Sequence, residues 1–141
     1  MRCFIHLSLL AAAVSLFSGC STPSAVPSKS VAKDPNGNLH LYVSNQSFAI
    51  SPVDIKVLID GELVVDGLFE VGSQHSWQTF VLRLSPGRHK IVVKSSKGHA
   101  KFEQTFEING ETWAALTYWF DSKAKEGHFV LDVKDKPIYF M

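Results

Sequence analysis

The side chains best suited to acid–base or metal chemistry are spread along this 141-residue chain rather than clustered. Five histidines follow the N-terminal segment: His40, His75, His89, His99 and His128. No two of them stand at the spacing of zinc ligands, and no cysteine lies near them. We expect His40 and His89 on the solvent faces of strands, and we expect His99 and His128, which each follow a glycine, in turns. The sequence therefore predicts no metal site.

Catalytic nucleophiles and acid–base pairs are not indicated either. No serine stands in a Gly-x-Ser-x-Gly elbow. The carboxylate pairs Asp60 with Glu62 and Glu103 with Glu107 fall in expected turns or strands, where solvated charge is the ordinary interpretation. We therefore expect a non-enzymatic protein without a cofactor. A hydrolase whose site the sequence does not reveal stays open as an alternative, and a buried His–carboxylate pair would favour it.

Large aromatic side chains are the one group with a potential for binding. The candidate platform consists of Trp77, Trp113, Tyr118 and Trp119. In an extended strand Trp113 and Trp119 share one face, whereas Leu116, Tyr118 and Phe120 share the other. Such a strand is either central, with both faces covered, or it exposes one face on which sugars or a partner's apolar side chains stack. Core packing is the favoured explanation, and the exposed platform stays open.

Strand-like runs separated by turn residues must position these side chains. They cover residues 39–43, 53–59, 62–65, 77–84, 89–94, 101–108, 112–120, 127–133 and 138–140. The turn sequences between them include Asp60-Gly61, Asp66-Gly67, Ser85-Pro86-Gly87, Lys97-Gly98 and Asn109-Gly110. This spacing predicts an all-β fold, a single Ig-like antiparallel β-sandwich of about 7–9 strands. Residues 121–126 form either one helical turn or a polar hairpin loop.

Two runs indicate which of their faces is buried. Phe80, Leu82 and Leu84 share one parity, and so do Phe102, Phe106 and Ile108. The C-terminal residues 137–141 either add a last strand or offer an apolar tail to a partner.

The charge balance argues against nucleic acid as a partner. Lys and Arg number 14 against 13 Asp and Glu. One of the 14, Arg2, lies in the N-terminal segment, so the rest of the chain is formally neutral. Binding to nucleic acid or to an anionic membrane surface depends on clustered Lys and Arg.

The first 19 residues have the pattern of a secretory signal peptide. Arg2 precedes a short apolar run that ends in small residues at Ser18-Gly19. A transmembrane helix needs about 20 largely apolar residues, and this run is shorter. A plain N-terminal anchor helix is the alternative.

The sequence Leu16-Phe17-Ser18-Gly19-Cys20 resembles the lipobox of bacterial lipoproteins, although Phe17 stands where the family favours Leu. The resemblance implies that Cys20 becomes the N-terminus and carries diacylglycerol together with a fatty-acyl chain such as palmitate, and several acyl chains give a stable membrane anchor. Ser21 fits transport to the outer membrane in this family. Cys3 would leave with residues 1–19; a Cys3–Cys20 disulfide is the alternative. Residues 20–38, rich in Ser, Pro and Ala, then form a flexible tether, and residues 39–141 form the sandwich.

A second resemblance concerns the body of the chain. Strand 57–59 followed by Asp60-Gly61, and the turn Pro86-Gly87-Arg88-His89 before a long hairpin, are similar to the PEGA type of bacterial surface β module. The sequence departs from that family after Asp60-Gly61, because a longer segment reaches to Phe80. The resemblance implies an Ig-like module outside the cytoplasm.

Taken together, these features predict a lipid-anchored binding or assembly module of the cell envelope. We expect it at the outer membrane, facing the periplasm or the surface, with an envelope protein as its partner. The alternative ligand is a glycan or peptidoglycan bound by exposed aromatic rings.

Overall fold

The computed structural model describes residues 31–72 and 76–140. The expected signal peptide, Cys20, most of the expected tether and His75 lie outside these residues. Within the described ranges there is no helix long and apolar enough to cross a membrane.

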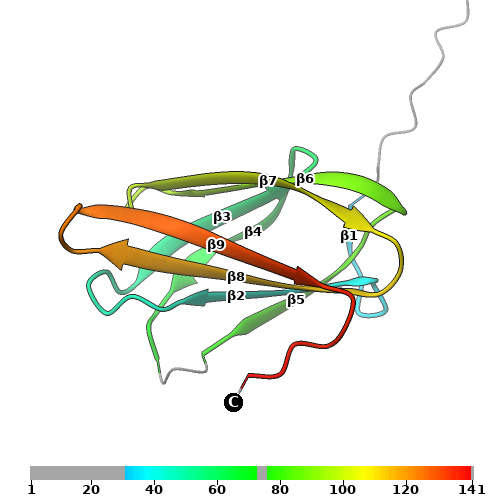
Figure 1. Ribbon diagram of the computed structural model, residues 1–141, viewed down its shortest axis with the longest axis horizontal. Coiled ribbons are helices and arrows are strands. Elements are labelled where there is room, and N and C mark those ends of the chain that lie inside the picture. Colours follow the sequence, from blue (N-terminus) through cyan, green and yellow to red (C-terminus); the bar gives the residue numbers. More distant parts are fainter. Residues whose placement is uncertain (1–30, 73–75, 141) are drawn as a thin grey trace, which may run out of the picture.

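Nine strands within the described residues form two sheets packed face to face (Figure 1). The strands are β1 (Ala32–Lys33), β2 (Leu39–Asn45), β3 (Val53–Ile59), β4 (Glu62–Phe69), β5 (Gln78–Arg83), β6 (Gly87–Ser95), β7 (Ala100–Ile108), β8 (Thr112–Asp121) and β9 (Glu126–Lys134). Sheet A has the order β1-β5-β2-β8-β9, and sheet B has the order β4-β3-β6-β7. The predicted all-β sandwich is thus confirmed.

One pair of neighbouring strands departs from the predicted antiparallel arrangement. Strands β2 and β8 run parallel, with Leu39 opposite Thr112 and Asn45 opposite Tyr118. Parallel neighbours need a long crossover connection, and the chain between them, which contains all of sheet B, supplies it. Consequently β8 is an inner strand of sheet A, between β2 and β9.

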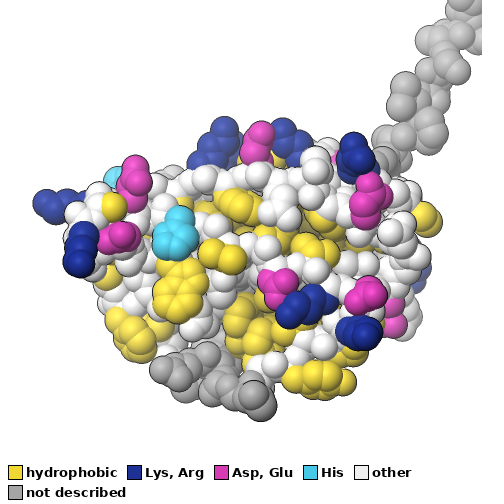
Figure 2. All heavy atoms as spheres, viewed as in Figure 1, with side chains coloured by type: hydrophobic (Ala, Val, Ile, Leu, Met, Phe, Trp, Pro, Cys, Tyr) yellow, Lys and Arg dark blue, Asp and Glu magenta, His cyan; other side chains and the backbone are white. Residues whose placement is uncertain are grey.

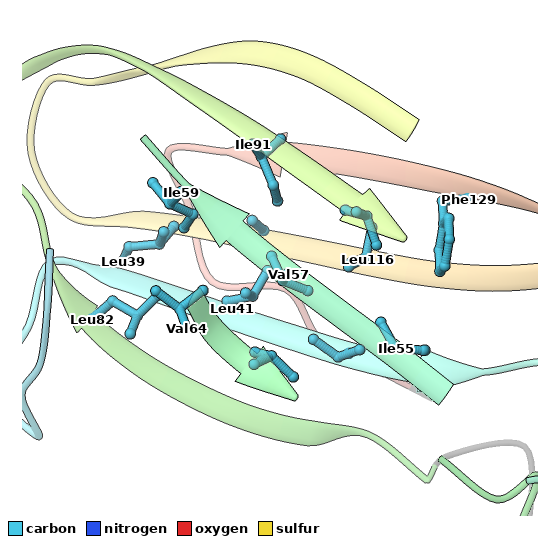
Figure 3. Close-up of a cluster of buried hydrophobic side chains, with 14 of the residues drawn as sticks. Leu39, Leu41, Ile55, Val57, Ile59, Val64, Leu82, Ile91, Leu116 and Phe129 are labelled. Carbon is cyan, nitrogen blue, oxygen red and sulfur yellow. The ribbon is translucent and has the colours of Figure 1, made fainter. Parts of the chain in front are cut away.

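The core is built from alternate residues of both sheets. Leu39, Leu41 and Val43 of β2 are buried against Ile55, Val57 and Ile59 of β3, and Figure 3 shows several of these side chains pointing toward one another. The expected inward parities of β5 and β7 are confirmed, since their largest apolar side chains contact this cluster. Each fully buried Leu or Ile contributes about 1.5–3 kcal/mol.

Turn chemistry agrees with the structure at most positions. Asp60 and Gly61 have φ values of 51° and 87°, as a two-residue type I′ hairpin requires. Asp66-Gly67 is not a turn, however: β4 runs through it, and Asp66 pairs with Lys56 across the ladder. Residues 121–126 close the β8–β9 hairpin, so the loop alternative is the right one.

The ordered domain begins before the expected boundary at Leu39. Strand β1 pairs with β5, and Arg83 Nε donates to Asp34 Oδ2 over 2.6 Å. The Asn38 amide continues the edge of the sheet, because its Nδ2 donates to Leu84 O and its Oδ1 accepts from Leu84 N. Residues 31–38 therefore belong to the sandwich rather than to a tether. The polar composition of these residues does not reveal this in the sequence, since their contacts are made largely by the backbone and by polar side chains.

The expected last strand at residues 138–140 does not form. Strand β9 ends at Lys134. Pro137 has no N–H to donate to a ladder, which prevents the sheet from continuing through it.

Candidate binding surface

The outer face of sheet A, turned away from the core, carries three aromatic side chains that are not buried: Tyr42, Trp113 and Trp119. Alternation along β2, β8 and β9 directs one set of residues inward and the other outward. We define the outer face of sheet A by its outward side chains on these three strands: His40, Tyr42, Ser44, Trp113, Ala115, Thr117, Trp119, His128, Val130, Asp132 and Lys134.

At one end of this face an imidazole and an indole are stacked. His40 and Trp113 stand opposite each other on β2 and β8, with ring centroids 5.3 Å apart and an interplanar angle of 7°. His40 Nε2 also lies 3.0 Å from Glu111 Oε1. Both residues are partly buried, so Trp113 is a partly covered member of the surface. The expected outward placement of His40 is confirmed.

At the other end Trp119 lies in an open hollow. Register places Trp119 opposite His128, and the hollow of about 610 Å³ is lined by these two residues together with Phe120, Asp121, Ser122, Lys123 and Val130. Trp119 is 44% exposed and Val130 is 46% exposed. Figure 2 shows hydrophobic side chains and a histidine together over this end of β8 and β9. The expectation that His128 lies in a turn is wrong, because β9 begins two residues earlier.

The rim of the hollow carries a fixed negative charge. Asp121 accepts hydrogen bonds from the backbone N–H groups of Ala124 and Lys123, which hold the pKa of its carboxyl below the usual range. Positive charge on His128 acts in the same direction, whereas slight desolvation opposes it. The exposed indole is therefore surrounded by a carboxylate, an ammonium, a hydroxyl and an imidazole.

Tyr118 does not belong to this surface, which corrects its place in the predicted platform. It is fully buried, and its hydroxyl donates to Gly98 O over 3.1 Å. Burial raises the pKa of its phenol, and the nearby Asp54 carboxylate raises it further. The residue points inward because it alternates with Trp119 along β8.

Trp77 lies beside the outer face of sheet A, and the C-terminal Phe140 connects it to Tyr42 of that face. It precedes β5, and the Phe140 ring stacks on it with centroids 4.1 Å apart. The same Phe140 ring meets the Tyr42 ring edge-on at 5.1 Å. Of the four predicted platform residues, three thus reach the outer side of sheet A: Trp77, Trp113 and Trp119.

A buried His–carboxylate pair does exist elsewhere, at His89. The side chain is buried inside the sandwich, so its expected solvent position is wrong; it shares the inward parity of Ile91 and Val93. Its Nδ1 lies 2.7 Å from Asp60 Oδ2 and its Nε2 lies 2.7 Å from Ser85 O. Both ring nitrogens are thus occupied by oxygen atoms of the fold itself, and neither faces a nucleophile. The arrangement ties the β3–β4 turn to β6 and does not favour a hydrolase.

Smaller surface hollows lie elsewhere on the described residues, one of about 400 Å³ beside Leu68 and Trp77 and one of about 240 Å³ at the β7–β8 turn. No group of three or more His, Cys, Asp or Glu side chains in the described ranges is arranged to hold a metal ion. Every buried side-chain nitrogen or oxygen in these ranges has a hydrogen-bond partner. The interior gap beside Ala114 and Ile59 is too small for a water molecule.

Comparisons with known proteins leave the family of this chain open. Neither a protein-family model nor a curated protein matches it. What is established is therefore an all-β domain of two packed sheets, and its function has to be argued from the surface of sheet A.

Proposed function

We propose that this protein is a lipid-anchored, non-enzymatic module of the bacterial cell envelope that binds an envelope protein through the outer face of sheet A. The anchor rests on the resemblance of residues 16–20 to a lipobox, with Cys20 as the lipid-bearing residue. The binding role rests on the chemistry of the outer face.

The observation that carries the binding role is the exposure of Trp119 and Val130 side by side. Trp119 and Val130 come from neighbouring strands, and both leave nearly half of their surface in water. Exposed apolar patches rimmed by polar groups mark interaction sites, and tryptophan is enriched among the residues that dominate binding energy. The Asp121 and Lys123 side chains supply that polar rim.

The shape of the face favours a protein partner. Trp113 and Trp119 are six residues apart on one strand, which separates them by roughly 20 Å. The hollow is open rather than enclosed, whereas small-molecule sites usually bury most of their ligand. A broad, open sheet face with separated aromatic side chains suits the surface of another protein.

A second candidate function, glycan binding, is favoured by the surroundings of Trp119 alone. An exposed indole can stack on the apolar face of a sugar while Asp121, Lys123 and His128 bond its hydroxyls. This candidate requires only the hollow, whereas the protein-binding proposal uses the whole face.

Site-specific crosslinking in intact cells tests the proposal. A photoreactive residue at Val130 should yield a defined protein adduct, and one at Thr105, exposed on β7 of sheet B, should not. Adducts at both positions or at neither would contradict the protein-binding role. The anchor is tested separately: a Cys20→Ala variant that still carries lipid mass, or that still fractionates with membranes, would contradict it.

Protease treatment of intact cells then separates the two envelope locations. Digestion of the domain in intact cells would indicate surface exposure. Protection until the cells are permeabilised would indicate the periplasm.

A further inference from the structure

The C-terminal segment crosses the outer side of sheet A instead of extending β9. Phe140 lies in a notch between two aromatic rings, stacked on Trp77 at 4.1 Å and 22° and edge-on to Tyr42 at 5.1 Å and 77°. Ile138 is partly buried like Phe140, whereas Tyr139 between them is 84% exposed. This alternation is that of an extended peptide with one side turned to the protein.

The strand order of sheet A prepares the notch. Tyr42 stands opposite Thr79 on β5 and opposite Ala115 on β8. Trp77 lies just before β5, on the outward parity that it shares with Thr79. The side chains that flank Tyr42 on its two neighbouring strands are thus small, and neither Thr79 nor Ala115 fills the space beside its ring that Phe140 occupies.

The segment is held by side-chain rings and by little else. In the described part of the chain, no hydrogen bond joins residues 135–140 to the sandwich. Asp135, Lys136 and Pro137, which lead into the segment, are all exposed. Such a contact can open without disturbing a strand ladder, because Pro137 keeps the segment out of the sheet.

We propose that the Trp77–Tyr42 notch is a binding site for an extended peptide that carries an aromatic side chain, and that residues 137–140 occupy it as an internal competitor. The inference rests on the proposed function, because it names the chemistry of the partner and the regulation of the same face. The occupant already seated in the notch is a peptide with a phenyl ring, which is direct evidence of what the notch accepts. A partner's chain end with the character of Ile138-Tyr139-Phe140 fits it.

The internal segment has an advantage over a free peptide. A short tether presents its ligand at an effective concentration in the millimolar range. A partner segment must therefore displace the tail, and it does so by adding contacts along the outer face toward Trp113. The tail thus keeps two aromatic rings covered until a partner with both sets of contacts arrives.

The test uses the full chain in detergent and a labelled peptide of residues 136–141, Lys-Pro-Ile-Tyr-Phe-Met. The Phe140→Ala variant should bind this peptide about tenfold more tightly than the unaltered chain, or better, because its own tail no longer fills the notch. The matched control is Tyr139→Ala, which alters an exposed ring of the same tail and should leave the affinity unchanged. A peptide with alanine at the place of Phe140 should not bind the variant.

Three results would overturn the inference. The first is absence of peptide binding to Phe140→Ala at millimolar concentration, or equal binding to the variant and the unaltered chain. The second is a dimer of the unaltered chain that Phe140→Ala dissociates, which would make the occupant a second copy rather than another protein. The third is tighter binding of a chito-oligosaccharide by the opened variant with no peptide binding, which would make the notch a glycan site.

Thermal unfolding of each variant controls for folding. Because the tail lies outside both sheets, the midpoint should be nearly unchanged. Failure of the peptide test together with a specific adduct at Val130 would remove the notch and keep the proposed function. Peptide binding without an adduct at Val130 would keep the notch as a peptide site and remove the proposed function.

Discussion

The two outer faces of the sandwich, built on the same alternation of strands, carry different chemistry. Sheet B carries three cross-strand pairs of opposite charge, Lys56 with Asp66, Lys90 with Glu103 and Arg88 with Glu107, at 3.2–3.4 Å, and its edge strand β4 also exposes Leu63 and Leu68. On sheet A the corresponding positions hold stacked rings, an exposed tryptophan and valine, and a seated phenylalanine. On this difference rests the proposal that the outer face of sheet A, and not that of sheet B, binds a partner.

The charged face of sheet B gains little stability from its ion pairs. Exposed pairs contribute about 0–1 kcal/mol each. Their effect is rather to oppose association, since a partner would have to strip water from six charged groups. Leu63, 54% exposed on the edge strand β4, stands opposite Leu58 on this side and serves as a control for Trp119.

The largest expected effect comes from disturbing the contact between the end of sheet A and the β6–β7 turn of sheet B. A Cβ on Gly127 would collide with Gly98 O and with the Tyr118 ring, whose positions are fixed by β6–β7 and β8. We expect Gly127→Ala to lower the free energy of unfolding by about 3 kcal/mol, as overpacking against backbone does. Hydrogen exchange should rise first in β8 and β9, around the Trp119 hollow.

The matched control is Gly110→Ala, because a Cβ there meets open space. It should change stability by no more than about 0.5 kcal/mol. An equal loss for both variants would show that the close contact at Gly127 is not the cause.

The next largest effect is on partner affinity, and it compares an exposed side chain of sheet A with one of sheet B. Trp119→Ala should weaken the partner's affinity by thirtyfold or more, the equivalent of about 2 kcal/mol for a central aromatic contact. Leu63→Ala removes a similarly exposed apolar side chain from the other side and should leave the affinity unchanged. Titration of the crosslinked partner against both variants measures this. Equal losses would mean that general hydrophobicity, not the face of sheet A, determines binding.

Much of this fold is predictable from local sequence, and the surface is less so. Alternation identifies the strands, and Asp60-Gly61 identifies its hairpin, because φ > 0 at two successive positions demands such residues. The parallel pairing of β2 with β8 is not predictable in this way, since it joins segments about 70 residues apart. Asp66-Gly67 misleads for a related reason: its ladder partners on β3 decide its conformation.

The site was predictable in part. The parity of Trp113 and Trp119 is visible in the sequence, and a hairpin loop at residues 121–126 implies that Trp119 faces His128 by counting back from the loop. The contribution of Tyr42 and Phe140 is not visible, because neither the tail's path nor the position of Trp77 follows from any local pattern. His89 was misplaced because histidine is read as polar, although its parity with Ile91 and Val93 pointed inward.

A smaller effect concerns acid stability and the turn that closes sheet B. Burial alone would raise the pKa of Asp54, but hydrogen bonds from Ser96 N, Lys97 N and the Ser95 hydroxyl outweigh it, and the net shift is downward. A carboxyl with a lowered folded-state pKa stabilises the fold above its unfolded pKa of about 3.9, and that contribution is lost as the pH falls through the folded value. Asp54→Asn should therefore lose about 1–3 kcal/mol at pH 7 and show a weaker acid dependence than the unaltered chain in urea unfolding between pH 7 and pH 3. An unchanged acid dependence would assign it to other carboxyls, such as Asp34 beside Arg83.

The smallest effect is spectroscopic and leaves stability nearly unchanged. The three tryptophans all lie on the outer side of sheet A, but they differ in cover: Phe140 is stacked on Trp77, His40 is stacked on Trp113, and Trp119 is the exposed member. We expect Trp119→Phe to remove most of the emission that acrylamide quenches, and Trp113→Phe to remove little of it. Opening the tail with Phe140→Ala should then raise the quenchable fraction through Trp77. If quenching is spread evenly over the three rings instead, the tail does not cover its notch in solution, and the two ends of sheet A are equally open to a partner.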